Sequence, residues 1–404
     1  MKRTCTFLAG LFLLAAVTAA CSATPTPAPV ATNAPIPTQA QATVSSSSAA
    51  SGQPIVLGAF AGATGVLKVY GSYEDEGWQL AQEDLNKQGG ILGRQVEIRF
   101  MDDASDKDQA RSIMERFVAT PEIIGVMGPT STANAFASDP VAVKAGLPVI
   151  AVSNNAAGVV EQGDVVWRIS IPEDRLEPAV VKRVVNDLGI KKAAILYAQD
   201  DPFSQTGFDA FNNALKQLGV QITASIAYSS KTPDFGPQIR QLLAGSPEVV
   251  FVAAYAEDAG NFLRQARSGG LTVPIVGNLS FNSPTQLQVA GSAADGLIIG
   301  SQWWIDDPDP LNQAFVKEYR AKFNRDPGNF SAMAYDGAFV IKAALEASKD
   351  VSRAGLQKGM SALKGYRALG APITFDKRDS FSDEPIMLMV KNGQFVKFDP
   401  KALK

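Results

Sequence analysis

The sequence predicts an α/β protein built from two doubly wound lobes, each with a largely parallel sheet. Apolar runs of strand length alternate with helical segments from Ile55 onward, which is typical of such layers. Residues 123–155 contain a strand, a helix and a second strand, with small polar side chains after each strand. Pro121-Glu122 and the strand that follows it are echoed by Pro247-Glu248 and its strand, which indicates two related halves.

Composition excludes several classes of function. The 404 residues suffice for two domains, and a formal net charge of −3 argues against nucleic acid as a partner. The chain has no histidine, which removes imidazole bases, Ser-His-Asp and Cys-His sites, and zinc sites built on histidine. Its 2 cysteines, Cys5 and Cys21, both precede the predicted folded body. We therefore expect no catalytic residues, no metal site and no cofactor, although carboxylate or lysine chemistry stays formally open.

The N-terminal segment has the pattern of a secretory signal. Residues 1–20 combine a basic start with an apolar run that is too short to span a membrane. The ending Thr18-Ala19-Ala20-Cys21 resembles a bacterial lipobox, with threonine where that motif usually has leucine, and it implies a lipid on Cys21. Residues 21–53 are rich in Ala, Thr, Pro and Ser and contain no charge, which predicts a disordered tether. The alternative is a plain secretory signal with an incidental cysteine.

The predicted elements of the body follow from periodicity and breakers. In the first half we expect strands at 55–60, 96–101, 123–127 and 149–152, with helices at 73–88, 111–118 and after Thr132. After Pro172 we expect helices at 177–188, 207–218, 235–243, 258–268, 308–323 and 331–348, with strands at 193–197, 222–228 and 249–253. Three short strands at 373–375, 386–391 and 394–398 close the chain, and Asn392-Gly393 predicts a hairpin between the last two.

Most isolated motifs have an ordinary structural interpretation. Gly58, Gly62 and Gly65 lack the spacing of a dinucleotide loop. The acid pairs that begin at Asp102, Asp200 and Asp306 fit solvated turns and helix caps better than a catalytic or metal site.

Sparse aromatic residues are more informative. Tyr70, Phe203, Tyr255 and Phe330 are expected in loops or at strand ends, and together they would enclose a small organic ligand. For each one alone, a core or surface role is the simpler interpretation.

Four stretches together resemble the leucine/isoleucine/valine-binding proteins of bacterial ABC importers. They are Gly89–Gly93 (GGILG), the DDASD that follows a strand, GPTSTANAFASDPVAVKAGLPVIAVS, and Asn261–Leu271 (NFLRQARSGGL). The resemblance extends from Pro54 to Lys404 and implies a type I periplasmic-binding-protein fold, with a three-crossing hinge. It implies a first lobe of residues 54–171 and 303–384 and a second of residues 172–302 and 385–404.

The resemblance also implies a site. The hydroxyl that holds a ligand carboxylate falls on Thr132, beside Ser131, and a second polar strand end falls on Ser153, Asn154 and Asn155. The four aromatic residues form its walls. The position of the acid that pairs with an α-ammonium is occupied by Leu279. Burying an ammonium without a counter-charge costs several kcal/mol. We therefore expect a simple amino acid to bind poorly, unless Asp336, Glu257 or Asp258 supplies the charge.

These implications define a function to be tested. We expect a monomeric, extracytoplasmic lipoprotein that binds a small polar or carboxylate-bearing solute (an amino acid, amide or organic acid) and delivers it to an ABC permease. The alternatives are a ligand-sensing subunit of a membrane receptor and, as a third class, an extracytoplasmic enzyme.

Overall fold

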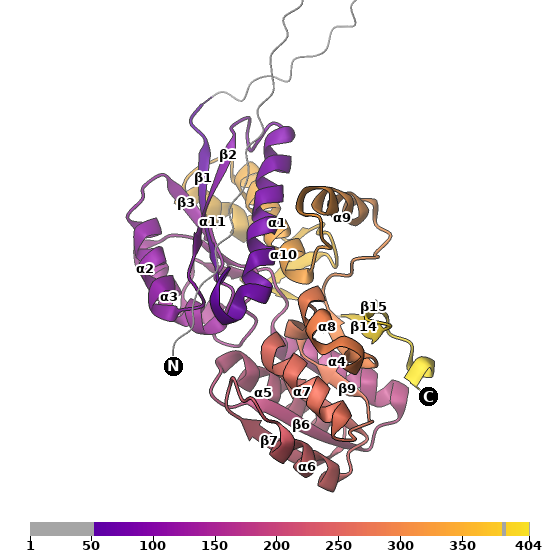
Figure 1. Cartoon of the computed structure of the whole chain (residues 1–404). Helices are drawn as coiled ribbons and strands as arrows, with labels where there is room; N and C mark the ends of the chain where they lie inside the picture. The colour runs from indigo at the N-terminus through magenta and orange to yellow at the C-terminus, as the bar shows by residue number, and fades with distance from the viewer. Residues whose placement is uncertain (1–51, 382–384, 404) are drawn as a thin grey trace, which may run out of the picture. The chain divides into compact units, whose positions relative to one another are not determined.

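The computed structural model describes residues 52–381 and 385–403, in which two sheets organise two lobes (Figure 1). We call the part built on the eight-stranded sheet the first lobe and the part built on the seven-stranded sheet the second lobe. The predicted signal peptide, Cys21 and most of the predicted tether lie outside the described residues.

The first sheet has the order β11-β12-β13-β5-β4-β3-β1-β2, and its strands from β13 to β2 run parallel. Its strands are β1 (Ile55–Ala61), β2 (Val96–Asp102), β3 (Ile123–Met127), β4 (Val149–Ala151), β5 (Val166–Arg168), β11 (Gly365–Tyr366), β12 (Ile373–Asp376) and β13 (Asp379–Phe381). Along β1, alternate side chains enter different cores: Leu57 packs on one face of the sheet, and Val56 and Phe60 pack on the other.

Helices cover both faces of the first sheet. On one face lie α1 (Lys68–Lys87), α9 (Pro310–Phe323), α10 (Asn329–Ser348) and α11 (Arg353–Ala362); on the other lie α2 (Lys107–Val118) and α3 (Thr132–Ala145).

The second sheet has the order β15-β14-β10-β9-β8-β6-β7, with β10 to β7 parallel and β14 and β15 antiparallel. Its strands are β6 (Lys192–Ala198), β7 (Gln221–Tyr228), β8 (Val249–Ala253), β9 (Ile275–Gly277), β10 (Leu297–Ser301), β14 (Ile386–Lys391) and β15 (Gln394–Lys397). One face is covered by α4 (Glu173–Leu188) and α5 (Pro202–Gln217), and the other by α6 (Gly236–Gly245), α7 (Ala256–Ser268) and α8 (Pro284–Ala290).

Short 3-10 helices complete the connections. They are η1 (Gly65–Leu67), η2 (Val160–Gln162), η3 (Leu279–Phe281), η4 (Gly291–Ala294) and η5 (Pro400–Leu403). None of the helices within residues 52–381 and 385–403 combines the length and apolar character that a membrane span requires.

The chain crosses between the two sheets three times, as predicted: after β5, after β10 and between β13 and β14. The fold class predicted from the sequence is therefore confirmed. In both lobes the parallel strands are connected by helices, and polar loops follow the carboxyl ends of the strands. This is the edge at which open α/β sheets bind ligands.

Local sequence explains where the key helices begin. Ser131 is the N-cap of α3, and its side-chain oxygen accepts a hydrogen bond from the Asn134 backbone N–H at 3.2 Å. Asp201 caps α5 in the same way, accepting from the Ser204 N–H at 2.7 Å. Helix α3 ends at Gly146, whose φ of 64° is costly for residues with a side chain.

Four helices begin four or five residues earlier than predicted. Helix α1 starts at Lys68 rather than residue 73, and α2 at Lys107 rather than 111. Helix α4 starts at Glu173 rather than 177, and α5 at Pro202 rather than 207. Their first turns carry glycine, proline or charged residues instead of an apolar face, so periodicity detects only the later turns.

Candidate functional site

A small cavity brings together residues from both lobes at the carboxyl ends of the strands. It is lined by every residue of the predicted ligand site except Ser131, and by two further hydroxyls: Tyr70, Thr130, Thr132, Ser153, Asn154, Asn155, Phe203, Tyr255, Leu279, Ser280 and Phe330. No Lys, Arg, Asp or Glu is among these lining residues. Ser131 instead serves as the α3 N-cap described above.

The four predicted aromatic residues contact one another across the cavity. The Tyr70 ring lies 4.5 Å from that of Phe330 and 6.0 Å from that of Tyr255, and Tyr255 stacks on Phe203 at 5.0 Å. The Tyr70 hydroxyl also accepts a hydrogen bond from the Ala256 N–H at 2.5 Å. The four rings therefore lie together, and their contacts join the two lobes directly.

The expected location of these aromatic residues in loops is wrong for three of them. Tyr70, Phe203 and Phe330 lie in the first turns of α1, α5 and α10, and only Tyr255 precedes its helix, as the residue before α7. The missed first turns are the cause. Helix starts, rather than loops, aim these rings at the cavity.

The enclosed volume is about 10 Å³, close to the minimum that a single water molecule requires. A solute therefore enters only when the aromatic side chains or the lobes that carry them move apart. A larger cavity of about 470 Å³ is lined by α8, Trp303, Trp304 and the β14–β15 hairpin, and by none of the predicted ligand residues.

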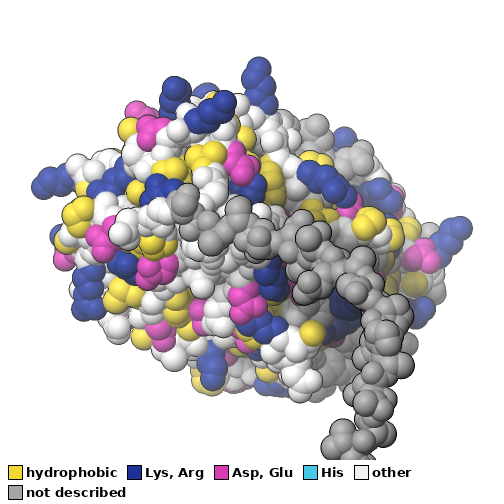
Figure 2. All heavy atoms as spheres, turned by 90° about the horizontal axis from the view of Figure 1, so that it is seen from above, with side chains coloured by type: hydrophobic (Ala, Val, Ile, Leu, Met, Phe, Trp, Pro, Cys, Tyr) yellow, Lys and Arg dark blue, Asp and Glu magenta, His cyan; other side chains and the backbone are white. Residues whose placement is uncertain are grey.

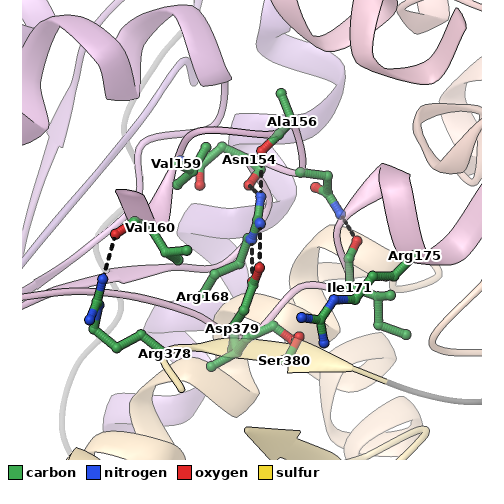
Figure 3. A network of polar contacts seen from close by, with 12 residues as sticks. Asn154, Ala156, Val159, Val160, Arg168, Ile171, Arg175, Arg378, Asp379 and Ser380 are labelled. Carbon is green, nitrogen blue, oxygen red and sulfur yellow. Dashed lines mark hydrogen bonds and ion pairs between the residues drawn. The ribbon is translucent and has the colours of Figure 1, made fainter. Parts of the chain in front are cut away.

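Polar residues of the first lobe are held from behind by a buried arginine (Figure 3). Arg168 of β5 pairs with both carboxylate oxygens of Asp379, at 2.6 and 2.7 Å, and its Nη1 donates to the Ala156 carbonyl at 2.6 Å. The Asn155 side-chain amide donates to the Ile171 carbonyl at 2.6 Å. These contacts fix the loop after β4, so that Asn154 and Asn155 reach the cavity.

A buried acid that the sequence analysis missed lies behind the same wall. Glu74 of α1 is fully buried and accepts hydrogen bonds from the hydroxyls of Thr130, at 2.5 Å, and of Ser153. Burial raises the pKa of Glu74 to about 7, although those two hydrogen bonds oppose the shift and Asp103 adds to it. Tyr70 and Glu74 lie four residues apart on α1, so a helix predicted to start at Lys68 would have placed Glu74 on the same face as the Tyr70 ring.

Close packing brings the hydroxyl of Thr130 into this position. A Cβ on Gly71 would lie 2.4 Å from the Gly62 backbone, so only glycine lets the first turn of α1 approach the β1–α1 loop. The Gly62 N–H then donates to the Thr130 hydroxyl oxygen at 3.1 Å.

In the second lobe, two more buried carboxyls lie next to Leu279. The side-chain amide of Asn278 donates to Glu173 at 3.4 Å, and burial raises the pKa of Glu173 to about 8. Burial also raises the pKa of Glu177 well above its usual value, and the adjacent Glu173 adds to the shift. Buried carboxyl groups thus lie behind the cavity in both lobes, although no Asp, Glu, Lys or Arg side chain lines it.

None of the three acids that we expected to replace the one missing at Leu279 lines the cavity. Glu257 is exposed, and Asp258 accepts a hydrogen bond from the Lys231 N–H at 3.1 Å. Asp336 accepts from the Leu369 N–H at 3.2 Å, and burial raises its pKa to about 8.

The acid pairs form turns and helix caps, as predicted, but Asp103 and Asp201 are buried rather than solvated. Asp103 accepts a hydrogen bond from the Ser105 N–H, Asp201 caps α5, and Asp307 accepts from the Asp309 N–H. Within the described ranges, no group of three or more Cys, Asp or Glu is placed to hold a metal ion. On the face shown in Figure 2, basic and acidic side chains are interspersed.

Two lobes joined by three crossings, with a lined cavity at the strand ends of both, define a bilobed solute-binding protein. Residues 54–393 match the family model described as periplasmic binding protein, and the chain belongs to that family.

Relatives and solved structures agree with this assignment. The chain is 24% identical over 379 residues to the Leu/Ile/Val-binding protein homolog 7 of Brucella abortus (strain 2308), covering 88% of this chain and 94% of that protein. It is 23% identical to the Leu/Ile/Val-binding protein of Escherichia coli (strain K12), covering 82% and 89%.

Among solved structures, the substrate-binding protein LivJ of Streptococcus pneumoniae, in complex with isoleucine, superposes with a TM-score of 0.78. It is 25% identical, and the match covers 85% of this chain and 99% of that one. The leucine-binding protein LivK of Thermotoga maritima, at 21% identity, has the same TM-score and covers 85% and 98%. All four are named as binding proteins, in agreement with the family to which the chain belongs.

Proposed function

We propose that this protein is a lipid-anchored, extracytoplasmic receptor that captures a small polar or carboxylate-bearing solute and delivers it to an ABC permease. The observation that carries the proposal is the gathering of the predicted ligand residues around one cavity between two lobes. The solute class follows from the lining, in which hydroxyls and amides provide polar contacts and four aromatic rings provide apolar area.

Thr132 is the proposed contact for a carboxylate. It lies in the cavity at the first turn of α3, where the helix dipole favours a negative group. Tyr70, Phe203, Tyr255 and Phe330 would cover the apolar part of the solute, and Leu279 would contact it from the second lobe.

The first experiment identifies the solute. Native mass spectrometry of the purified protein should detect a small molecule that co-purifies, and a thermal-shift screen of amino acids, their amides and their deaminated acids should find ligands. If nothing co-purifies and no solute in the screen raises the melting temperature, the solute-binding proposal for this cavity fails.

Delivery to a permease requires a separate test in cells. Deleting the gene should abolish high-affinity uptake of the identified solute, and restoring it should restore uptake. If uptake is unchanged while a signalling response to the solute is lost, the protein serves a receptor rather than a transporter.

A further inference from the structure

The hydroxyls of Thr130 and Ser153 are held with a fixed direction. Each hydroxyl has one proton, and each donates toward a different oxygen of the Glu74 carboxyl, Thr130 to Oε2 and Ser153 to Oε1. When Glu74 is ionised it can only accept, so both protons point away from the cavity. What the two hydroxyls offer to a solute is then lone pairs.

A third acceptor lines the same cavity. The side-chain nitrogen of Asn154 donates to the Pro129 carbonyl at 2.9 Å, which fixes the orientation of the amide because the flipped form would set two oxygens against each other. The Asn154 Oδ1 is buried and has no hydrogen-bond partner among the described residues. Leaving such an acceptor unpaired costs about 1–3 kcal/mol, so its position points to a donor on the solute.

We propose that the first lobe binds a primary ammonium group of the solute at Thr130, Ser153 and Asn154, with Glu74 behind them as the counter-charge. An ammonium has three donors, and these residues offer three acceptors on one side of the cavity. This proposal rests on the proposed function and narrows its solute to one that carries an amine. It supplies from α1 the negative charge that Leu279 does not provide.

The carboxylate of such a solute would be bound by Thr132, apart from the residues that bind the ammonium. Thr132 lies at the first turn of α3, and its hydroxyl is not part of the Glu74 cluster. The two ends of an α-amino acid would therefore be distinguished by hydroxyls of opposite polarity within one lobe. Thr130 and Ser153 accept from the ammonium, and Thr132 donates to the carboxylate.

The charged group that faces Glu74 from the β2–α2 loop is Asp103, whereas the loops after β3 and β4 face it with hydroxyls. Asp103 is itself held by the Asn134 amide at 2.8 Å and by the Ser105 N–H. Glu74 has no ion pair with Lys or Arg in the part of the chain that the structure describes. A solute ammonium would be the first cation to approach it.

The test uses three matched probes: leucine, 4-methylpentanoate, which lacks the ammonium, and 3-methylbutylamine, which lacks the carboxylate. Affinities are measured by calorimetry for the wild type and for Glu74→Gln, which keeps the shape of the side chain. In the variant, the new amide N–H₂ must donate to one of the two hydroxyls, whose proton then no longer points at residue 74. For Ser153 the other acceptor is the Thr130 carbonyl at 3.1 Å, and a Thr130 proton would turn toward the cavity. We expect the wild type to prefer leucine to 4-methylpentanoate, and Glu74→Gln to reduce that preference about tenfold or more.

Asp139→Asn is the matched control. Asp139 is another fully buried carboxyl of the first lobe that accepts a hydrogen bond from a hydroxyl, that of Ser138, but it does not line the cavity. This variant should keep the wild-type preference. A Glu74→Gln protein with an unchanged preference, or an equal loss in Asp139→Asn, would overturn the inference.

A second measurement needs no variant and covers a Glu74→Gln protein that does not fold. Calorimetry of leucine binding at pH 7, in two buffers of different ionisation enthalpy, should show proton release by the wild type, because an ammonium drives ionisation of Glu74. Proton uptake, or no exchange, would count against the role of Glu74.

The outcomes also separate this inference from the proposed function. A wild type that prefers 4-methylpentanoate, or that co-purifies with a solute lacking an amine, overturns the inference and leaves solute binding intact. A protein that binds no solute of any kind contradicts both.

Discussion

The ion pair between Arg168 and Asp379 joins distant parts of the first lobe and supports the loop that lines the cavity (Figure 3). Arg168 belongs to β5 and Asp379 to β13, which pairs with β5 in the sheet. The Arg168 side chain is only 2% exposed and that of Asp379 12%. Asp379→Ala would leave a guanidinium buried with the Ala156 carbonyl as its remaining close partner.

The expected magnitude follows from burial. Removing one partner of a buried, bidentate pair costs about 3–5 kcal/mol, because the remaining charge is uncompensated. The neighbouring pair between Arg175 and Asp376 provides a matched control, with an N–O distance of 3.1 Å and side chains 35% and 55% exposed. For Asp376→Ala, solvent screening limits the expected loss to about 0.2–1 kcal/mol.

Equilibrium urea unfolding measures both variants. Tryptophan fluorescence suits the purpose, because Trp167 precedes Arg168 and packs edge-on against Phe375 at 5.7 Å. We expect the free energy of unfolding to fall several kcal/mol further for Asp379→Ala than for Asp376→Ala. A difference below about 0.5 kcal/mol, the usual range for surface substitutions, would refute the reasoning.

Three further predictions concern the anchor, the cavity wall and a buried acid. Cys21→Ser should release the protein from the membrane fraction without changing solute affinity, and continued partitioning into detergent would contradict the lipid anchor. Tyr255→Ala should weaken solute binding by about 1–3 kcal/mol, since it removes a ring stacked on Phe203; unchanged affinity by calorimetry would exclude Tyr255 from the site. Burial raises the pKa of Asp139 from 3.8 to about 8, so the folded state holds this proton more tightly and its contribution to stability, complete below about pH 4, is lost as the pH rises to 8. Asp139→Asn should therefore reduce the decline in urea midpoint between pH 5 and pH 8, and an unchanged decline would assign it to other groups.

Strands were the part of the fold that sequence predicted best. Ile123–Met127, Val249–Ala253 and Ile386–Lys391 have the predicted bounds, because each is an uninterrupted apolar run between polar or breaker residues. The three-residue strands β5, β9 and β13 were not predicted, since a run that short has no measurable period, and β10 and β11 were not predicted either. The neighbours of β5 and β9 in the parallel sheets, rather than their own sequences, define them.

The cavity lining was predictable for a different reason. Thr132 begins the helix after β3, and Ser153 and Asn155 lie in the loop after β4. The carboxyl ends of parallel strands meet at one edge of a sheet. Ser131 was grouped with Thr132 because both carry hydroxyls, but the N-cap role takes the Ser131 side chain. Hydroxyls next to each other in sequence can thus have different roles, and only the helix start separates them.

The carboxyl that could pair with a solute ammonium was the part of the site that the sequence predicted least well, as Glu74 shows. The acids predicted to replace the one missing at Leu279 were Asp336, Glu257 and Asp258, whereas Glu74 lies inside α1 and 79 residues from Ser153 in sequence. A carboxyl needs no direct contact with a cation to favour it, because a hydroxyl between the two donates to the acid and presents its lone pair to the cation. Once Glu74 orients Thr130 and Ser153, the leucine at position 279 no longer implies that an ammonium is rejected. In the proposed site, recognition of the ammonium passes from the second lobe to the first, where hydroxyl direction, rather than a lining charge, would distinguish an amine from a carboxylate.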